Sequence, residues 1–319
     1  MGYRIGMDVG GTNIVAGIFD ADGKLLRRSK TRTVKSSSNE LLEQLASLCK
    51  ELLTVEQISE ELLISVGIGL PGFINKETGL VTAANLPFND IPVAERLNVL
   101  IGVPVTVEND VKMIVYGESL KGAGKAYSHV LGITLGTGMS SAWVTNGSLH
   151  GGAGGLAGEI GHIAFADIPY VCGCGMTGCL ETVVSASGVA RQARDGLAAG
   201  WVGLLADRFP SELRDELTSK DVWQAYMDGD AFAGQVFQRT ASWLSRVIIP
   251  SVALLSPDVI IVGGGVAAAG DVFFEPLRAY VSENLHPLYR ERLLIVPTLL
   301  GEDSGIYGSA EYAARQRIA

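Results

Sequence analysis

The sequence has no long uninterrupted hydrophobic run, no excess of basic residues and few cysteines. Its most apolar stretch, residues 247–262, is interrupted by Pro250 and Pro257, which argues against a membrane span. Lys and Arg number 25 against 34 Asp and Glu, a net charge of -9, and nucleic-acid-binding proteins need a basic surface. Met1–Asp8 leads directly into a strand-like pattern without the features of a signal peptide. We therefore expect a cytoplasmic protein with no membrane and no nucleic-acid partner.

Three of the four cysteines form a cluster with the spacing of metal ligands. Cys172, Cys174 and Cys179 lie close together, and His162 precedes them. Three thiolates and one imidazole make a complete tetrahedral set for a structural Zn²⁺, with no position left for water. The alternatives are three buried apolar cysteines, or one disulfide with a thiol left over, but the intervening glycines favour turns around a shared metal. Cys49, in a leucine-rich helical stretch, is expected to be an inert core residue.

Two carboxylates flank this cluster. Glu159 precedes His162 in the motif Gly-Glu-Ile-Gly-His, and Glu181 follows Cys179 in Cys-Leu-Glu. A carboxylate accepts two hydrogen bonds, which suits the vicinal hydroxyls of a sugar. A glutamate beside a metal cluster can equally hold a metal ligand in place. We favour sugar binding for both glutamates.

The order of hydrophobic patterns predicts an α/β protein. A chain of 319 residues, 47% of them hydrophobic, is long enough for two domains of ordinary size. The expected strands are residues 3–9, 13–20, 24 onward, 64–70, 103–107, 258–262 and 293–296, and the expected helices are 38–53, 110–120, 186–199, 219–226, 231–255 and 304–317. Ser38 is expected to cap the first helix.

The opening of the chain is repeated. Gly6–Thr12 has a counterpart in Gly132–Gly138, and each is followed by an apolar strand and a glycine hairpin. The match is short, but two strand–loop–strand units of this kind indicate duplicated α/β halves that face a cleft. Between them, the two loops could hold a polyphosphate.

Three glycine loops favour nucleotide binding. Asp8 ends a strand before Gly10–Asn13, where free N–H groups can hold phosphate oxygens and the Thr12 hydroxyl adds a donor. The Asp8 carboxylate is placed to hold Mg²⁺ directly or through water. One such loop alone is compatible with an ordinary hairpin turn. Because Gly136–Gly138 and Gly263–Gly265 provide a second and a third, we favour a nucleotide site.

The segment Glu108–Asp110 lies between an expected strand and an expected helix. A carboxylate there could take a proton from a hydroxyl nucleophile, but Asn and Asp are also the preferred residues for capping a helix. The spacing alone favours neither. Asn85–Pro87 and Pro71–Phe73 are turns, and loop geometry accounts for them on the sequence alone.

Taken in order, these motifs resemble those of the ROK family (repressors, open reading frames and sugar kinases). The resemblance is carried by Asp8–Asn13, Glu108–Asp110, Leu135–Gly138, Gly154–His162, Cys172–Glu181 and Val262–Val266. It implies an α/β fold of the two-domain actin/hexokinase-like (ribonuclease H-like) type, with a cleft between the duplicated halves. We expect a small domain over residues 1–120, completed by a C-terminal helix over 304–319, and a larger domain over 121–303 that carries the zinc segment.

The resemblance also implies ATP-dependent phosphorylation of a hexose at its 6-hydroxyl, with Asp110 as the general base. It assigns to the sugar Gly72, Asn85, Asn109, Asp110, Glu159, His162 and Glu181, where His162 would turn one ring nitrogen to zinc and the other to the sugar. It assigns to Mg²⁺ and ATP Asp8, Gly10, Gly11, Thr12, Asn13, Gly136, Thr137, Gly138, Gly263, Gly264 and Gly265. The zinc ligands would be His162, Cys172, Cys174 and Cys179. Relatives are usually dimers or tetramers, so we expect a homodimer or a homotetramer.

The sequence departs from the family pattern at two places. Met139–Ser141 follows the second loop where many kinases of the family have Ile-Gly-Gly-Gly, and Asn13 follows Thr12 where a lysine often stands. Neither departure removes a residue to which the resemblance gives a chemical role.

Glucose is the first substrate to expect, because the segments around Asn85, Glu108 and Cys172 resemble those of glucokinases. Kinases of N-acetylmannosamine, N-acetylglucosamine, allose, mannose and fructose share the same hydroxyl-binding residues, and polyphosphate is an alternative donor. Repressors of the family carry a helix-turn-helix segment ahead of the first glycine loop, and Asp8 leaves no room for one, so we do not expect a repressor. A sugar sensor without catalysis is a further alternative, against which Asp8, Asp110 and Thr137 argue together.

Overall fold

The computed structural model describes residues 2–316, and its contacts divide the chain into two compact units. The first unit comprises the chain up to Ser128, Ala142–Ala157 and the chain from Thr298 on, and the second comprises His129–Ser141 and Gly158–Pro297. The first unit therefore extends beyond the expected boundary at residue 120 and also takes in residues 142–157. Residues 317–319, the end of the expected C-terminal helix, lie outside the described residues.

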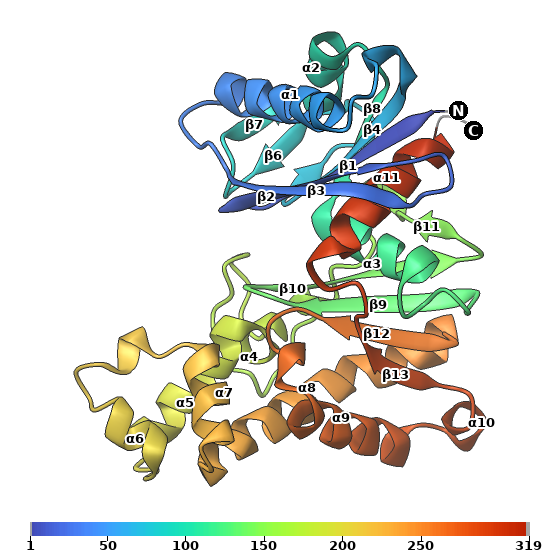
Figure 1. The fold of residues 1–319 in the computed structure, drawn as a ribbon. Helices are drawn as coiled ribbons and strands as arrows, with labels where there is room; N and C mark the ends of the chain where they lie inside the picture. Colours follow the sequence, from blue (N-terminus) through green and yellow to red (C-terminus); the bar gives the residue numbers. More distant parts are fainter. Residues whose placement is uncertain (1, 317–319) are drawn as a thin grey trace. The chain divides into compact units, whose positions relative to one another are not determined.

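The sheet of the first unit has the strand order β3-β2-β1-β4-β8 (Figure 1). The meander β1 (Tyr3–Val9), β2 (Asn13–Phe19) and β3 (Leu25–Arg32) is antiparallel, and β4 (Leu63–Leu70) and β8 (Val105–Asn109) continue from β1 in parallel. Side chains alternate along a strand, so the odd-numbered residues of β1 join the core with α1 (Ser38–Val55) and α2 (Val93–Ile101). Asp8 consequently lies on the opposite face of the sheet.

That opposite face is covered by α3 (Asp110–Lys121) and α11 (Ser304–Gln316) (Figure 1). The approach of α11 is very close, because a Cβ atom at Gly67 would lie 1.8 Å from the Ser309 carbonyl oxygen, and one at Gly308 would lie 1.8 Å from that of Met113. Only glycine permits backbones to approach in this way. The last described helix is thus packed directly on β4 and α3, on the face that Asp8 shares.

A small second sheet of the first unit was not predicted. Its strands, in the order β5-β6-β7, are β5 (Phe73–Ile74), β6 (Val81–Ala83) and β7 (Phe88–Ile91). Such short strands are below the length at which hydrophobic alternation can be recognised. They position two residues assigned to the sugar, since Gly72 immediately precedes β5 and Asn85 lies between β6 and β7.

The other large sheet repeats the order of the first. It runs β11-β10-β9-β12-β13, with β9 (His129–Leu135), β10 (Met139–Thr145), β11 (Ser148–His150), β12 (Val259–Gly263) and β13 (Leu294–Pro297). Three consecutive strands are again followed by two strands that continue from the first of them in parallel. This shared topology confirms the α/β fold with duplicated halves.

The second unit is rich in helices, as the sequence predicts. They are α4 (Glu181–Val184), α5 (Ala186–Ala198), α6 (Leu204–Arg208), α7 (Ser219–Met227), α8 (Ala231–Leu255), α9 (Asp271–Asn284) and α10 (Pro287–Arg290). The long helix α8 packs against α9, α7 and α5. Over residues 2–316, no helix combines the length and the apolar character needed to cross a membrane.

Most expected elements are confirmed with shifts of one or two residues at their ends. One prediction is wrong in detail, because Ser37 rather than Ser38 caps α1 and accepts a hydrogen bond from the Glu40 amide at 3.2 Å. Three consecutive serines made the capping position ambiguous. Helix α9 was missed because Pro276 interrupts its pattern.

Candidate active site and metal centre

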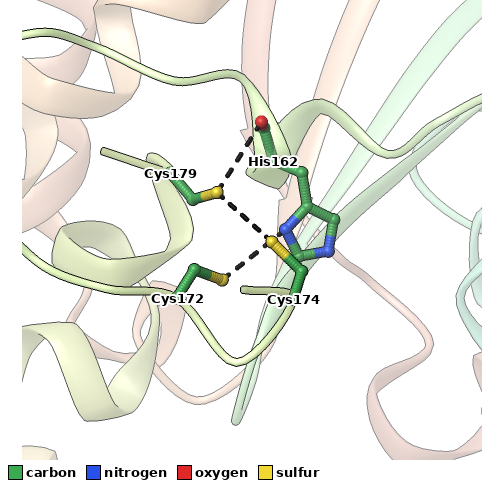
Figure 2. A group of neighbouring side chains, drawn as sticks. All are labelled: His162, Cys172, Cys174 and Cys179. Atoms are coloured by element: carbon green, nitrogen blue, oxygen red, sulfur yellow. Dashed lines mark hydrogen bonds between the residues drawn. The ribbon is translucent and has the colours of Figure 1, made fainter. Parts of the chain in front are cut away.

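The four predicted zinc ligands come together in the second unit (Figure 2). Their ligand atoms all lie within 4.8 Å of one another. Cys174 Sγ is 3.6 Å from Cys179 Sγ, and Cys172 Sγ is 3.7 Å from His162 Nδ1. With bonds of about 2.3 Å to sulfur and 2.0 Å to nitrogen, a tetrahedral zinc separates its ligand atoms by roughly 3.5–3.8 Å. The spacing of these side chains therefore fits one Zn²⁺.

The alternatives for these cysteines fit less well. All four cysteines are free thiols, and 3.6 Å between Cys174 and Cys179 is far beyond the length of a disulfide bond. Cys174 is exposed, which does not suit a set of buried apolar residues. Cys49 behaves as predicted, because burial in the core raises the pKa of its thiol to about 12.

His162 turns its two ring nitrogens in different directions. Nδ1 faces the thiol of Cys172, and Nε2 lies 3.8 Å from a carboxylate oxygen of Glu159. Glu159 itself is exposed. One imidazole can therefore contact a metal through one nitrogen and a polar ligand through the other, the double role assigned to it.

Glu181 joins the cysteine cluster to the second glycine loop. At the start of α4, one of its oxygens accepts a hydrogen bond from Cys172 Sγ at 3.5 Å, and the other accepts one from the Met139 amide at 2.8 Å. A Cβ atom at Gly138 would lie 2.5 Å from the second oxygen. Both carboxylate oxygens thus have partners within the second unit. This agrees with the alternative that a glutamate beside the cluster holds a metal ligand in place.

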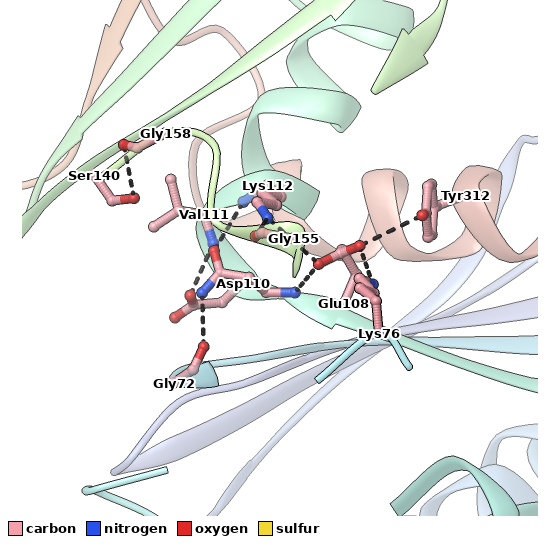
Figure 3. A network of polar contacts seen from close by, with 11 residues as sticks. Gly72, Lys76, Glu108, Asp110, Val111, Lys112, Ser140, Gly155, Gly158 and Tyr312 are labelled. Carbon is pink, nitrogen blue, oxygen red and sulfur yellow. Dashed lines mark hydrogen bonds and ion pairs between the residues drawn. The ribbon is translucent and has the colours of Figure 1, made fainter. Parts of the chain in front are cut away.

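The strand after the second loop is regular despite its unusual residues. Ser141 is buried, its amide donates to the Gly158 carbonyl at 2.8 Å, and its hydroxyl donates to the same oxygen at 2.9 Å. The Ser140 hydroxyl makes a longer contact with that oxygen, at 3.5 Å (Figure 3). The serines of Met139–Ser141 therefore fasten β10 to the residue before Glu159.

The second and third glycine loops meet in the second unit. Gly264 packs so closely on β9 that a Cβ atom would lie 2.4 Å from the Leu135 carbonyl oxygen, and the Val266 amide donates to that oxygen at 3.2 Å. Gly136 and Gly265 have open space where a side chain would stand. Thr137 is exposed. Two adjacent loops with open backbone suit the phosphates of a nucleotide.

The first glycine loop belongs to the first unit. The Gly10 amide donates to the Asn13 carbonyl at 2.9 Å, and Thr12 and Asn13 are exposed. Thr33 braces the turn, because its hydroxyl donates to the Gly10 carbonyl at 2.7 Å and its amide to the Thr12 carbonyl at 3.0 Å. Sequence reasoning missed Thr33, whose role depends on the pairing of β2 with β3.

Residues assigned to sugar and nucleotide are neighbours in this unit. A Cβ atom at Gly11 would lie 3.1 Å from Asn85 Cβ. The first loop and the turn before β7 are therefore packed together, which no sequence motif indicated.

Asp8 is a partly buried carboxylate with an acidic neighbour. Burial, and then the charge of Asp110, raise its pKa to about 7. Gly305, in the first turn of α11, leaves it room, because a Cβ atom there would lie 2.8 Å from Asp8 Cγ. A carboxylate oxygen is the kind of ligand that Mg²⁺ prefers, so Asp8 fits the predicted cation.

The segment Glu108–Asp110 both caps a helix and presents a carboxylate. Asn109 is the N-cap of α3, and its side-chain oxygen accepts a hydrogen bond from the Lys112 amide at 3.2 Å, while its side-chain nitrogen donates to the Gly72 carbonyl at 3.3 Å. Asp110 is the first residue of α3, and its Oδ1 accepts from the Val111 amide at 2.8 Å. The capping alternative thus holds for Asn109, and Asp110 is the carboxylate whose charge acts on Asp8.

A sequence model described as the ROK family matches residues 4–316. The chain belongs to the ROK family. A glucokinase of Halalkalibacterium halodurans is 35% identical to this chain, and the match covers 98% of this chain and 96% of the relative. The glucokinase of Thermotoga maritima is 32% identical, and the match covers 96% of this chain and 95% of the relative. Among solved structures, a ROK family glucokinase from Streptomyces griseus in complex with glucose and AMPPNP has a TM-score of 0.81 and 29% identity, covering 98% of this chain and 100% of that one.

The ROK motifs are divided between the two units. The first unit brings together Gly11 with Asn85, Asp8 with Asp110, and Asn109 with Gly72. The second brings the predicted zinc ligands together with Glu159 and Glu181, and the loop Gly136–Gly138 with Gly263–Gly265. Sequence reasoning missed the partners of Glu108, because lysines carry no motif of their own.

Proposed function

We propose that this ROK protein is an ATP-dependent kinase that phosphorylates a hexose at its 6-hydroxyl, with glucose as its substrate. Similarity over nearly the whole length of proteins named glucokinase supports this reaction. The structural observation that carries the proposal is the pair of carboxylates Asp8 and Asp110, one at the end of a strand beside a glycine loop and the other at the start of a helix.

Asp110 would act as the general base. In this role its carboxylate accepts the proton of the sugar 6-hydroxyl as the phosphoryl group is transferred. The hydrogen bond from the Val111 amide to Oδ1 orients the group. Asp8 would hold Mg²⁺, which when bound offsets negative charge on the phosphate oxygens.

The hydroxyls of the sugar would be bound by Asn85, Asn109, Glu159, His162 and Glu181, with the backbone of Gly72 nearby. Carboxylate, amide and imidazole groups suit this ligand, since each can pair with a hydroxyl. For His162, the nitrogen available for the sugar is Nε2, because Nδ1 faces the thiols. The structural Zn²⁺ would be held by His162 and the three clustered cysteines, and would keep these side chains in place.

ATP would be held by the three glycine loops, Gly10–Asn13, Gly136–Gly138 and Gly263–Gly265. Their backbone amides supply donors for phosphate oxygens, and the exposed hydroxyls of Thr12 and Thr137 supply more. The open space at Gly136 and Gly265 supports close approach of a phosphate to the backbone.

A coupled assay of ADP release tests the function. Purified protein with Mg²⁺ and ATP is offered glucose, mannose, fructose, allose, N-acetylglucosamine and N-acetylmannosamine, with Asp110→Asn as the control. We expect turnover with glucose that the variant lacks. A higher kcat/KM with another sugar would replace glucose as the substrate, and polyphosphate in place of ATP tests the donor. ATP hydrolysis that no sugar stimulates, in protein shown to contain zinc, would contradict the kinase.

Assembly and location belong to the same proposal. We propose a cytoplasmic homodimer or homotetramer with no nucleic-acid partner. The net charge of -9 supports the last point. Sedimentation equilibrium measures the assembly directly, and a monomer over the working concentration range would contradict it.

A further inference from the structure

A buried carboxylate next to the proposed general base has partners from several segments (Figure 3). Glu108, near the end of β8, is only 3% exposed. Its carboxylate forms an ion pair with Lys76 and lies 3.9 Å from Lys112 Nζ. It also accepts hydrogen bonds from the Asn109 amide at 2.9 Å and from the Tyr312 hydroxyl at 3.4 Å. Burial and the charge of Glu108 raise the pKa of Tyr312, so this hydroxyl keeps its proton to donate.

Lys112 links Glu108 to a segment that is distant in the sequence. It is 5% exposed, and its Nζ donates to the carbonyl oxygen of Gly155. Gly155 also lies close to Lys76, because a Cβ atom there would be 3.1 Å from Lys76 Cγ. A buried ammonium group is unfavourable unless it is paired and hydrogen-bonded, and Glu108 and the Gly155 carbonyl satisfy both conditions.

The residues Lys76, Glu108 and Lys112, called here the Glu108 cluster, connect segments that carry sugar-binding assignments. Glu108 holds the amide of Asn109, the residue before Asp110. Lys76 follows β5, the strand that Gly72 precedes. Gly155 lies shortly before Glu159 in the chain. The family resemblance gave no chemical role to Lys76, Glu108 or Lys112.

We propose that Glu108 and Lys112 are positioning residues for the sugar. They hold the Asn109–Asp110 turn and the segment Gly151–Ala157 in a fixed relation within the first unit. The expected change in the KM for hexose rests on the proposed hexose kinase function. The expected ordering of Gly151–Ala157 by Lys112 does not. Loss of the Lys112 ammonium group is expected to raise the KM for the hexose and to leave the KM for ATP unchanged.

The test compares three variants of the full chain. Lys112→Met keeps the length of the side chain but removes its charge and its bond to Gly155. Glu108→Gln/Lys112→Met removes both buried charges. Lys121→Met is the matched control, because it removes a lysine of the same helix that pairs with Glu311 at 3.2 Å. The measurements are KM for hexose and for ATP, kcat, Tm, and hydrogen exchange of the amides in Gly151–Ala157.

Lys112→Met is expected to raise the KM for hexose roughly tenfold, as for one lost hydrogen bond to a charged group, and to leave the KM for ATP unchanged. Exchange in Gly151–Ala157 should become faster. The double variant should recover Tm lost in Lys112→Met but keep the raised KM, which a merely stabilising ion pair would not do. Lys121→Met should match wild type in both KM values and in exchange.

Wild-type hexose KM and wild-type exchange in Lys112→Met would overturn the proposal, as would recovery of KM in the double variant. If the wild-type protein phosphorylates no hexose, the kinase proposal fails. Exchange then still decides whether Lys112 orders the segment, and unchanged exchange would overturn the inference on its own.

Discussion

The Asp110 carboxylate raises the pKa of Asp8, because the two negative charges oppose each other within the first unit. Burial of Asp8 acts in the same direction and is the larger cause. The result is a pKa of about 7 in place of 3.8, so Asp8 in the folded protein without ligands is mostly protonated below about pH 7. This arrangement disfavours the ionised pair in the absence of a cation, so binding of a divalent ion is favoured electrostatically.

Asp8→Asn should stabilise the protein in a pH-dependent way when no metal or nucleotide is bound. The folded-state pKa of Asp8, about 7, is above the unfolded value of 3.8. Its contribution to the stability of the fold is therefore complete below pH 4 and is lost as the pH rises through 7. The variant's gain in the free energy of unfolding over wild type should therefore grow between pH 4 and 7 and be largest above pH 7, on the order of a few kcal/mol, and its Tm should rise in parallel. Thermal unfolding at several pH values measures it. A gain that is the same at every pH would contradict the raised pKa.

Asp110→Asn should lower kcat by about 10²–10⁴, the usual contribution of a positioned base. The amide keeps the size of the side chain and can still accept from the Val111 amide. Glucose binding, followed by tryptophan fluorescence or calorimetry, should change little. A variant with wild-type kcat would rule out Asp110 as the base, and a variant that no longer binds glucose would reassign it to substrate binding.

Removal of zinc should reduce sugar affinity before it reduces anything else. We expect one zinc per chain by atomic absorption in wild type and none in Cys179→Ser. The KM for hexose should rise in the variant, because His162 and Glu181 lose their anchor. The KM for ATP should rise less, through the contact of Glu181 with the Met139 amide.

The matched control for zinc is Cys49→Ala. It removes a buried thiol that lies in the core of the first unit, outside the cluster. Zinc content and hexose KM should stay at wild-type values, whereas Tm falls. Full zinc content in Cys179→Ser would contradict the ligand assignment.

Glu118→Ala should be strongly destabilising. This fully buried carboxylate accepts hydrogen bonds from the Leu299 amide at 3.1 Å, the Leu300 amide at 2.8 Å, the Ala123 amide at 2.9 Å and the Ser304 hydroxyl at 2.8 Å. Truncation leaves several buried donors without an acceptor, so we expect a loss of at least about 3 kcal/mol in chemical denaturation. Ser304→Ala, which removes one of these donors, should cost about 1 kcal/mol. Equal losses in the two variants would show that the carboxylate is not the common acceptor.

The parts of the site that the sequence predicted are those with local causes. The four predicted zinc ligands lie within one segment, so their spacing and the turn residues between them were sufficient to predict that they cluster. The strand that carries Asp8 was recognisable from its apolar pattern and the glycines after it. The sequence left capping and proton transfer equally open for Glu108–Asp110, and the structure shows Asn109 as the cap of the helix directly after it. In each case the pattern lies within a single continuous segment of the chain.

The parts that the sequence did not predict depend on contacts between distant segments. The packing of Asn85 on Gly11, the bracing of the first loop by Thr33, and the bond from Lys112 to Gly155 each join residues far apart in the chain. No periodicity or capping preference reports such pairs. Likewise, residues 142–157 group with the first unit because of tertiary contacts that the order of elements does not reveal.

Phosphorus NMR of the product of glucose and ATP tests the central claim most directly. The account predicts a new sugar-phosphate signal split into a triplet by the two protons on carbon 6, formed by wild type and absent with Asp110→Asn. A doublet would place the phosphate on a carbon with a single proton and contradict the 6-hydroxyl as nucleophile. Inorganic phosphate alone would contradict the transfer to sugar altogether.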